Sequence, residues 1–163
     1  MLDLTTKSIP QLLSYHAEIL EELRRRDVVR SANNPTGDLA EYLFCAAFGW
    51  DQAANSEKSY DAVDSDGLRI QIKGRRLHRR NRSRQLSAMR DLSGFDVLAA
   101  VLFDDDYKIL RAAMMSSDIV REHSRFTPHT NSFRFLLRDS IWQLPGVTDV
   151  TDSLRAVEQA SAA

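Results

Sequence analysis

Residues 95–103 read Phe-Asp-Val-Leu-Ala-Ala-Val-Leu-Phe, and this nearly continuous apolar run indicates the fold most clearly. Such a run is typical of a central strand that is buried on both faces of a sheet. Upstream of it, residues 68–74 alternate between apolar and polar side chains, which predicts a strand with one buried and one polar face. Residues 59–63 precede this strand across the turn sequence Asp-Ser-Asp-Gly at 64–67, so the two segments are expected to form a hairpin.

Helices are expected on either side of these strands along the chain. Apolar residues at helical spacing predict a helix over residues 8–26, with Ser8 as its N-cap. A second helix is predicted over residues 36–48, with Thr36 as its N-cap and Gly49 at its C-terminal end. The other expected elements are strands over 50–54, 107–115 and 133–137, a helix that ends near residue 122 with Ser117 or Asp118 as its N-cap, and a helix over 151–160.

Together these elements predict an α/β fold with a mixed central sheet flanked by helices on both faces. The 163 residues suit a single domain over 1–163. We expect an N-terminal helical part at 8–31, a core at about 36–115, and a C-terminal strand and helices at 116–163. A hydrophobic content of 43% is too high for a disordered chain, and a chain of this length can bury a core of its own.

Two absences in the sequence limit the class of protein. There is no apolar run near 18 residues and no basic leader followed by an apolar segment, so neither a transmembrane helix nor a secretion signal is expected. Cys45 is the only cysteine, which excludes an internal disulfide and a cysteine-based zinc site. These features predict a cytoplasmic protein without a membrane partner.

Basic residues are concentrated in one segment, although the formal net charge is only −1. Residues 67–90 contain nine basic residues and no acidic one, which leaves 13 basic and 23 acidic residues in the rest of the chain. Residues 75–93 lack clear periodicity, which predicts a loop with one helical turn over 85–90. A positive segment of this density within an acidic protein predicts a nucleic-acid partner. The arginines expected to contact phosphate are Arg69, Arg75, Arg76, Arg79, Arg80, Arg82 and Arg84.

A group of polar residues next to this segment predicts a metal site. Asp61 lies before the turn, and Gln71 and Lys73 lie on the polar face of the following strand, so antiparallel pairing brings these side chains together. A carboxylate beside an amide oxygen suits Mg²⁺, or Mn²⁺ in its place. Lys73 is expected to help deprotonate a metal-bound water or to neutralise charge on a phosphate. Glu41 lies on the apolar face of the second helix, where a carboxylate needs a partner such as a metal or a lysine.

Three segments together resemble the PD-(D/E)XK nuclease superfamily: N-P-T-G-D-L-A-E at 34–41, Y-D-A-V-D at 60–64 and Q-I-K-G-R at 71–75. The glutamine in place of the usual glutamate is similar to the variant found in Mrr-type restriction endonucleases. The similarity covers about residues 36–115. It implies a restriction-endonuclease-like core and metal-dependent hydrolysis of phosphodiester bonds. The resemblance also implies a role for each site residue. The metal ligands would be Asp61, Gln71 and Glu41, and the residue that assists the attacking water would be Lys73.

The resemblance favours an endonuclease that acts on DNA in preference to RNA. A homodimer is compatible with it, because a single small domain that cuts both strands needs two sites. Gln71 is neutral, so metal binding is expected to be weaker than at a site with three carboxylates. The alternatives are a catalytically degenerate module that binds nucleic acid without cutting it, and a protein-interaction domain that uses the basic loop.

Each candidate residue also has an ordinary structural explanation. Asp61 suits a surface position near a turn, and the polar face of residues 68–74 suits a solvated sheet face. Glu41 could pair with an arginine in a structural bridge. The basic run could be a solvated loop, and His16, on the apolar face of its helix, is expected in the core.

Overall fold

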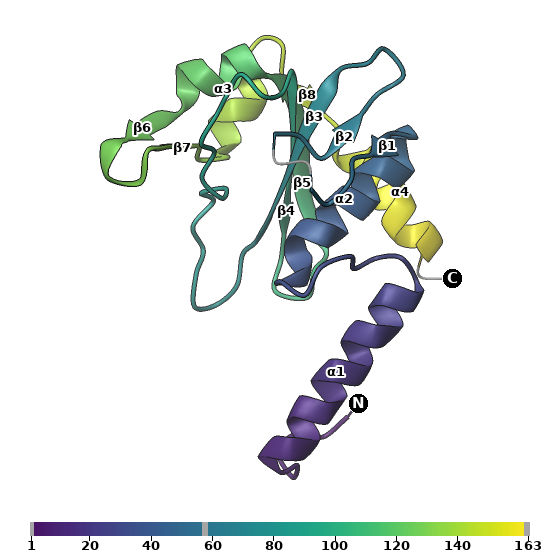
Figure 1. Ribbon diagram of the computed structural model, residues 1–163. Helices are drawn as coiled ribbons and strands as arrows, with labels where there is room; N and C mark the ends of the chain where they lie inside the picture. Colours follow the sequence, from purple (N-terminus) through teal and green to yellow (C-terminus); the bar gives the residue numbers. More distant parts are fainter. Residues whose placement is uncertain (1, 57–58, 162–163) are drawn as a thin grey trace.

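The computed structural model describes residues 2–56 and 59–161, which form a mixed α/β fold (Figure 1). The strands are β1 (Asp51–Gln52), β2 (Ala62–Val63), β3 (Arg69–Arg76), β4 (Val97–Phe103), β5 (Ile109–Ser116), β6 (Arg125–Thr127), β7 (Ser132–Arg134) and β8 (Thr148–Asp149). A six-stranded sheet has the order β1-β2-β3-β4-β5-β8, and β6 pairs with β7 separately. β3 and β4 pair in parallel, whereas the other neighbours in the large sheet pair antiparallel. The structure confirms the prediction of an α/β fold with a mixed central sheet.

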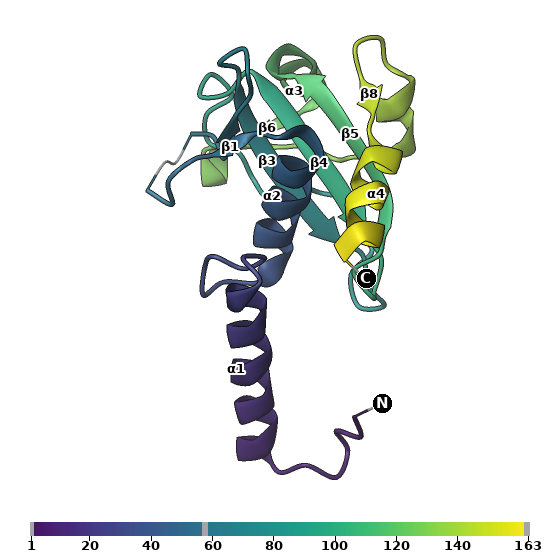
Figure 2. The same ribbon diagram turned by 90° about the vertical axis from the view of Figure 1, so that its right-hand side faces the viewer.

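The helices are α1 (Ile9–Arg25), α2 (Pro35–Phe48), α3 (Ser117–His123) and α4 (Thr151–Ser161). Figure 2 shows α2 and α4 side by side over one face of the large sheet, where they share a hydrophobic core with it. The opposite face is covered by α3 and by extended chain, including Leu86, Met89 and Phe135. The two faces therefore differ, because a helical layer covers one face and mostly irregular chain covers the other. None of the described helices is long and apolar enough to cross a membrane.

The apolar run at 95–103 forms the centre of the sheet, as predicted. From Leu98 to Phe103 every residue of β4 is buried, and successive side chains point to opposite faces. Ala99, Val101 and Phe103 pack toward α2 and α4, whereas Leu98, Ala100 and Leu102 pack toward the other face. Burial on both faces explains why the run lacks polar alternation.

The loop after β3 differs from the prediction. Residues 85–90 form no helical turn; instead they are extended, and Leu86 and Met89 donate backbone hydrogen bonds to the carbonyls of Phe135 and Phe133. The partners lie more than 40 residues further along the chain, and the burial of Leu86 and Met89 fixes the extended path. This loop is therefore a structural layer against the sheet over part of its length.

Two predicted helix caps are also wrong. Asn34, and not Thr36, caps α2, because its side chain accepts a hydrogen bond from the Thr36 amide and Pro35 begins the helix. Ser116, one residue before the predicted position, caps α3. Gly49 does end α2, with a positive φ of 66°, in agreement with the prediction.

Gly74 allows α2 to approach β3 closely, directly after Lys73. A Cβ at this position would lie 2.9 Å from Ala40 Cβ and 2.9 Å from the Thr36 carbonyl oxygen, both on α2. We expect Gly74→Ala to lower the free energy of unfolding by about 1–3 kcal/mol, because the helix must move away from the strand. Urea unfolding measures this change. The matched control is Gly37→Ala, because a Cβ there would meet nothing within 4 Å; an equal loss in both variants would contradict the close approach.

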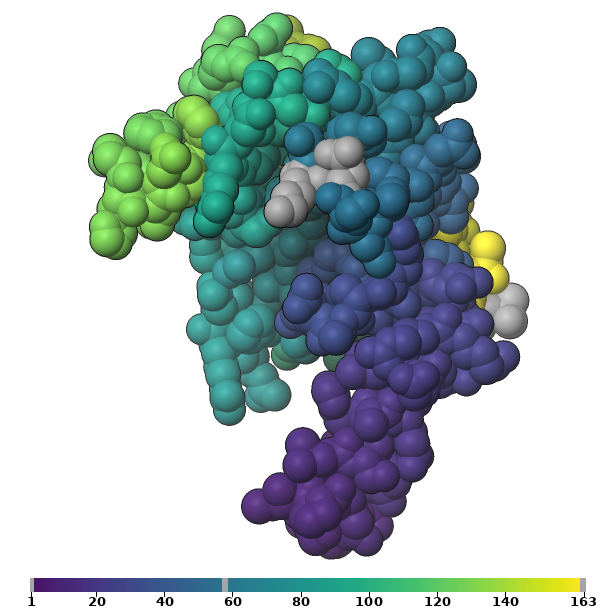
Figure 3. Space-filling model, in the orientation of Figure 1, coloured from purple at the N-terminus to yellow at the C-terminus, as the bar shows by residue number. Residues whose placement is uncertain are grey.

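Helix α1 stands apart from the rest of the domain (Figures 1 and 3). Ser8 caps it with a complete capping box, as predicted, but none of its residues is buried. His16 is exposed, so its predicted place in the core is wrong. The helical periodicity identified an apolar face without showing what covers that face.

Candidate active site

The β2–β3 hairpin places Asp61 against the polar face of β3. Ala62 pairs with Ile70, and the Asp61 amide donates to the Ile70 carbonyl at 2.8 Å. As a result, Asp61 Oδ2 accepts hydrogen bonds from the Ile72 amide at 2.7 Å and from Gln71 Nε2 at 2.5 Å. The turn that sets this register is stabilised by Asp64, whose Oδ1 accepts from the amides of residues 66 and 68.

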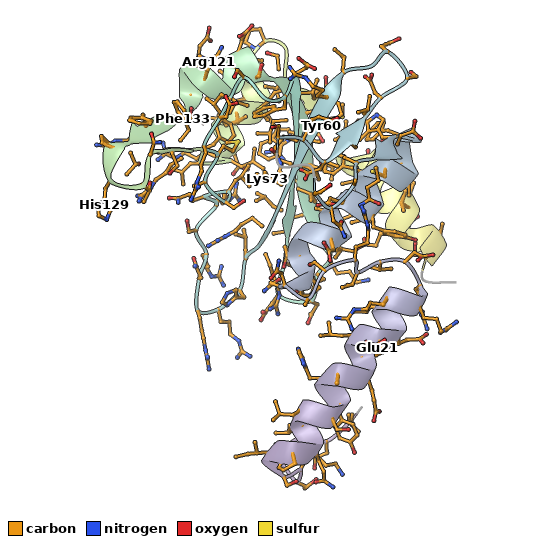
Figure 4. All side chains as sticks on the ribbon, viewed as in Figure 1. Glu21, Tyr60, Lys73, Arg121, His129 and Phe133 are labelled. Atoms are coloured by element: carbon orange, nitrogen blue, oxygen red, sulfur yellow. The ribbon has the colours of Figure 1, made fainter. Side chains whose placement is uncertain are left out.

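Glu41 reaches the same place from α2. A cleft of about 430 Å³ lies between α2, β3 and the loop after β3, and it brings together all four predicted site residues. Figure 4 shows Lys73 in the middle of the domain. The residues that line the cleft are Asn34, Thr36, Gly37, Glu41, Asp61, Gln71, Ile72, Lys73, Gly74, Arg75, Arg76, His78, Asn81 and Ser87.

The two carboxylates of the cleft are less acidic than ordinary ones. Burial raises the pKa of Asp61, and hydrogen bonds from Ile72 and Gln71 and the charge of Lys73 only partly oppose this effect. Burial also raises the pKa of Glu41. A hydrogen bond from Gln52 opposes this effect, whereas the negative charge of Asp61 raises the pKa of Glu41 further. The folded protein therefore holds two mutually repelling carboxylates in a partly desolvated site.

Lys73 lies in this site without a direct partner among the described residues. Burial lowers the pKa of its ammonium group, whereas the negative charges of Asp61 and Glu41 act in the opposite direction. It forms no hydrogen bond and no ion pair within 4.0 Å with residues 2–56 or 59–161. A lysine that is desolvated but unpaired has free donors for a ligand and a pKa closer to neutral pH than an exposed lysine.

The raised carboxylate pKa values predict a pH dependence of stability. The folded state binds the Asp61 proton more tightly than the unfolded state, so this contribution to stability is present below the ordinary pKa of 3.8 and is lost as pH rises through the raised value. In EDTA, we therefore expect the melting temperature of the wild type to fall relative to Asp61→Asn as the pH rises above the ordinary pKa of 3.8. Thermal unfolding followed by circular dichroism measures the difference, and added Mg²⁺ should remove it. A difference that does not vary with pH would contradict the raised pKa.

Several oxygen atoms of the cleft residues have no hydrogen-bond partner in the described part of the chain. Asp61 uses Oδ2 for its hydrogen bonds and Glu41 uses Oε2, so each carboxylate keeps a second oxygen without a partner among the described residues. Gln71 donates through Nε2, which leaves its amide oxygen open. The described part of the chain contains no group of three or more His, Cys, Asp or Glu side chains that could hold a metal ion. A cation here would therefore depend on the amide of Gln71, in a donor set of hard oxygens that fits Mg²⁺.

The predicted phosphate-binding arginines fall into two groups. Three of them form ion pairs within the protein: Arg69 with Asp96 at 3.0 Å, Arg76 with Asp105 at 3.0 Å and Arg84 with Asp139 at 2.7 Å. Acidic residues from other parts of the chain thus neutralise part of the positive charge of residues 67–90. The basic residues are separated from acidic ones in the sequence but not in the folded structure.

The other four arginines have little or no pairing with acidic groups in the described residues. Arg75 Nε donates to the Ser83 carbonyl, and Arg79, whose side chain is 91% exposed, lies 3.8 Å from Asp105. Arg80 and Arg82 have no acidic partner within 4.0 Å in the described chain. Arg80 and Arg82 are therefore fully available to an external anion, and Arg75 and Arg79 are each held by a single contact within the protein.

Arg79 and Arg80 lie at the tip of a short projection, residues 77–84, which we call the arm. Two backbone hydrogen bonds between His78 and Asn81 close a two-residue turn around them. The arm leaves the end of β3, so it continues the strand that carries Lys73 (Figure 1). His78 and Asn81 also line the cleft, which joins the candidate site to the arm.

Several residues near the site were not predicted from the sequence. Arg30 Nη1 lies 3.9 Å from Glu41 Oε2, and Gln52 Nε2 donates to the same oxygen at 2.8 Å. Arg30 is therefore the arginine partner of Glu41 that the sequence analysis considers, and the distance between them is at the limit for an ion pair. Asn34 and Thr36 line the cleft beside Glu41, and the N-P-T-G segment was the available signal for them.

Comparison with known proteins gives no family assignment. No protein-family model matches the chain, and no curated protein matches it.

Proposed function

We propose that this protein is a metal-dependent nuclease that hydrolyses phosphodiester bonds, with DNA as the preferred substrate over RNA. The observation that carries the proposal is the convergence of Glu41, Asp61, Gln71 and Lys73 on one cleft that the arm also lines. Carboxylates, an amide and an unpaired lysine beside free guanidinium groups suit a phosphate substrate with a bound cation. The resemblance to the PD-(D/E)XK nucleases supports the same function and a restriction-endonuclease-like core.

The metal site is proposed at Asp61, Gln71 and Glu41, through the oxygens without protein partners. A bound Mg²⁺ would lower the pKa of a water ligand and neutralise charge that develops on the phosphate. The protein contributes the position of these oxygens. The Ile72 amide fixes the Asp61 carboxylate, and Gln52 fixes that of Glu41.

Lys73 is proposed to act on the reacting groups. In hydrolysis the water oxygen forms a bond to phosphorus and gives up a proton, while the bond from phosphorus to the leaving sugar oxygen breaks and that oxygen takes up a proton from solvent. Lys73 can accept the proton of the water when neutral, or stabilise the charged phosphate when protonated. The burial that lowers its pKa increases the neutral fraction, and the absence of an ion pair among the described residues leaves its Nζ free to contact a ligand.

The free arginines of the arm are proposed to bind phosphates on either side of the scissile bond. We expect the double variant Arg79→Gln/Arg80→Gln to weaken duplex binding at all sequences alike. The slope of log K against log salt concentration should decrease by about 2, because each lost phosphate contact removes about one released counterion. Fluorescence anisotropy with a labelled duplex in EDTA measures binding without cleavage.

Arg84→Gln is the matched control for this prediction. It removes the same charge from the same segment, but Arg84 is already paired with Asp139 at 2.7 Å. Its salt slope should stay close to that of the wild type. If Arg79→Gln/Arg80→Gln and Arg84→Gln change the salt slope equally, the arginines at the tip of the arm do not differ from Arg84 in phosphate binding. That result would contradict the prediction.

The proposed function is tested by incubating labelled single-stranded and duplex DNA with the protein in Mg²⁺, in Mn²⁺ and in EDTA. We expect cleavage with either metal and none in EDTA. DNA that stays intact in both metals while binding the protein would favour the degenerate binding module. The hydrogen bond from Gln71 to Asp61 is the feature that favours this alternative, because an amide there partly replaces a cation.

A further inference from the structure

The exposed apolar side chains of this protein are concentrated at its N-terminal end. Ten large hydrophobic residues are exposed in the described chain, and six of them lie within the first 19 residues: Leu2, Leu4, Ile9, Leu12, Leu13 and Ile19. Four of the six belong to α1, a 17-residue helix that buries none of its residues. Isolated helices of this length are marginally stable in water, so α1 needs a partner surface.

The apolar face of α1 has the spacing of a coiled-coil seam. Ile9, Leu12, His16, Ile19 and Leu23 follow one another at intervals of three, four, three and four residues. Leu13 and Leu20 widen this seam on one side. Alternating intervals of three and four let one helix pack against another helix of the same pattern, which is the property of a self-complementary interface.

The charges of α1 favour a second copy of this chain over other partners. Most of its charged residues pair with one another, as Glu22 does with Arg25 and with the C-cap residue Arg26 at 2.7 Å, so they require no charged partner. Glu21 likewise pairs with Arg24. The seam itself contains no Asp, Glu, Lys or Arg. Glutamates beside the seam would repel nucleic acid and anionic lipid, which a basic amphipathic helix would attract.

The same charges favour antiparallel pairing. A parallel pair would place residues 21–26, which keep a net positive charge after Glu21 and Glu22 pair with arginines, beside their copies at one end. An antiparallel pair places the two arginine groups at opposite ends of the pair, about 25 Å apart for 17 residues at about 1.5 Å each. Most of α1 is open for this contact, because the helix projects away from the domain (Figures 1 and 2), and only its C-terminal end, at Leu23, lies beside α2 and α4.

The connection from α1 to the candidate site is well fixed. Val29 is buried, and Asp38 Oδ2 on α2 accepts hydrogen bonds from the amides of Arg30 and Ser31 at 2.9 and 2.8 Å. Glu41 lies one helical turn beyond Asp38. A partner held by α1 would therefore place its own cleft in a defined relation to the first.

We infer that α1 is a dimerisation helix, which pairs antiparallel with α1 of a second copy of this chain through the seam at Ile9, Leu12, His16, Ile19 and Leu23. A dimer of this kind would join two clefts and so supply the two sites needed to cut both strands of a duplex. This role for the dimer rests on the proposed function. The dimer itself does not depend on catalysis.

The inference is tested by the mass of the full chain in solution, without DNA or metal. Because the seam is short, we expect a dissociation constant in the micromolar range, so sedimentation equilibrium should show a dimer at about 100 µM. Leu12→Glu/Ile19→Glu should be monomeric at that concentration. Both residues are exposed in the monomer, so the thermal unfolding of the remaining domain should be unchanged. The matched control is Phe126→Glu, an exposed apolar residue of β6 that should leave the dimer intact.

Three results would overturn the inference: a monomeric wild type at about 100 µM, a double variant that remains dimeric, or a monomeric wild type that instead binds anionic phospholipid vesicles through α1. Failure of the nuclease would appear separately, as a dimer that does not cleave. If the protein cleaves, the double variant should convert supercoiled plasmid to the nicked form, whereas the wild type should also produce linear DNA.

Discussion

Replacement of Lys73 by Met is expected to reduce the rate of DNA cleavage by about 10²–10⁴-fold at saturating Mg²⁺, the range typical of a lost general acid or base. Met keeps the length and apolar stem of the side chain, so the packing between α2 and β3 should be retained. The affinity for duplex DNA should change little, because we propose that the arm makes the main phosphate contacts. Single-turnover cleavage of a labelled duplex, with binding measured in EDTA, separates the two effects.

The free energy of unfolding is a control for Lys73→Met, because it shows whether the variant is still folded. Burial disfavours the charged form of Lys73, so its replacement should not lower the free energy of unfolding strongly. Lys108→Met, which changes a lysine in the turn before β5, should leave cleavage at the wild-type rate. A Lys73→Met protein that cleaves as fast as the wild type would remove Lys73 from the mechanism.

Asp61→Asn is expected to have the second large effect, on metal binding as well as on cleavage. Asn keeps an oxygen that can accept the Ile72 hydrogen bond, but it loses the negative charge at the proposed cation site. We expect the affinity for Mn²⁺ to fall at least about 100-fold, since even the loss of a group that only orients a ligand costs 10–100-fold. Isothermal titration calorimetry with Mn²⁺ measures this affinity directly.

Asp61→Asn should lose function without losing stability. The charged Asp61 is disfavoured by burial, so in EDTA at pH 8 the variant should be at least as stable as the wild type. Asp64→Asn, at the nearby turn, is the comparison, because Asp64 orders backbone amides outside the cleft. Mn²⁺ affinity that is unchanged in Asp61→Asn would show that the cation site lies elsewhere.

The parts of the fold that were predictable are those encoded by neighbouring residues. The run at 95–103 predicts β4 because burial on both faces requires continuous apolar side chains. The turn sequence at 64–67 predicts the hairpin, and the hairpin register alone brings Asp61 to Gln71. This part of the candidate site follows from local chemistry.

The remaining features depend on residues far along the chain. Arg69, Arg76 and Arg84 are neutralised by aspartates 27, 29 and 55 positions away, so the sequence could not separate them from the free arginines. Leu86 and Met89 are held extended by residues 133–136, which local periodicity does not reveal. The exposure of α1 was unpredictable for a related reason, because an amphipathic pattern is the same whether the domain or another chain covers it.

The most direct test of metal-dependent hydrolysis at this cleft is a time course of supercoiled plasmid with the wild type in Mg²⁺. Lys73→Met protein, purified in the same way, controls for contaminating nucleases, and EDTA controls for the metal. We predict nicked and linear products from the wild type in Mg²⁺ and intact plasmid in both controls. Plasmid that stays intact with the wild type, or that is cut equally by Lys73→Met, would contradict the proposed function.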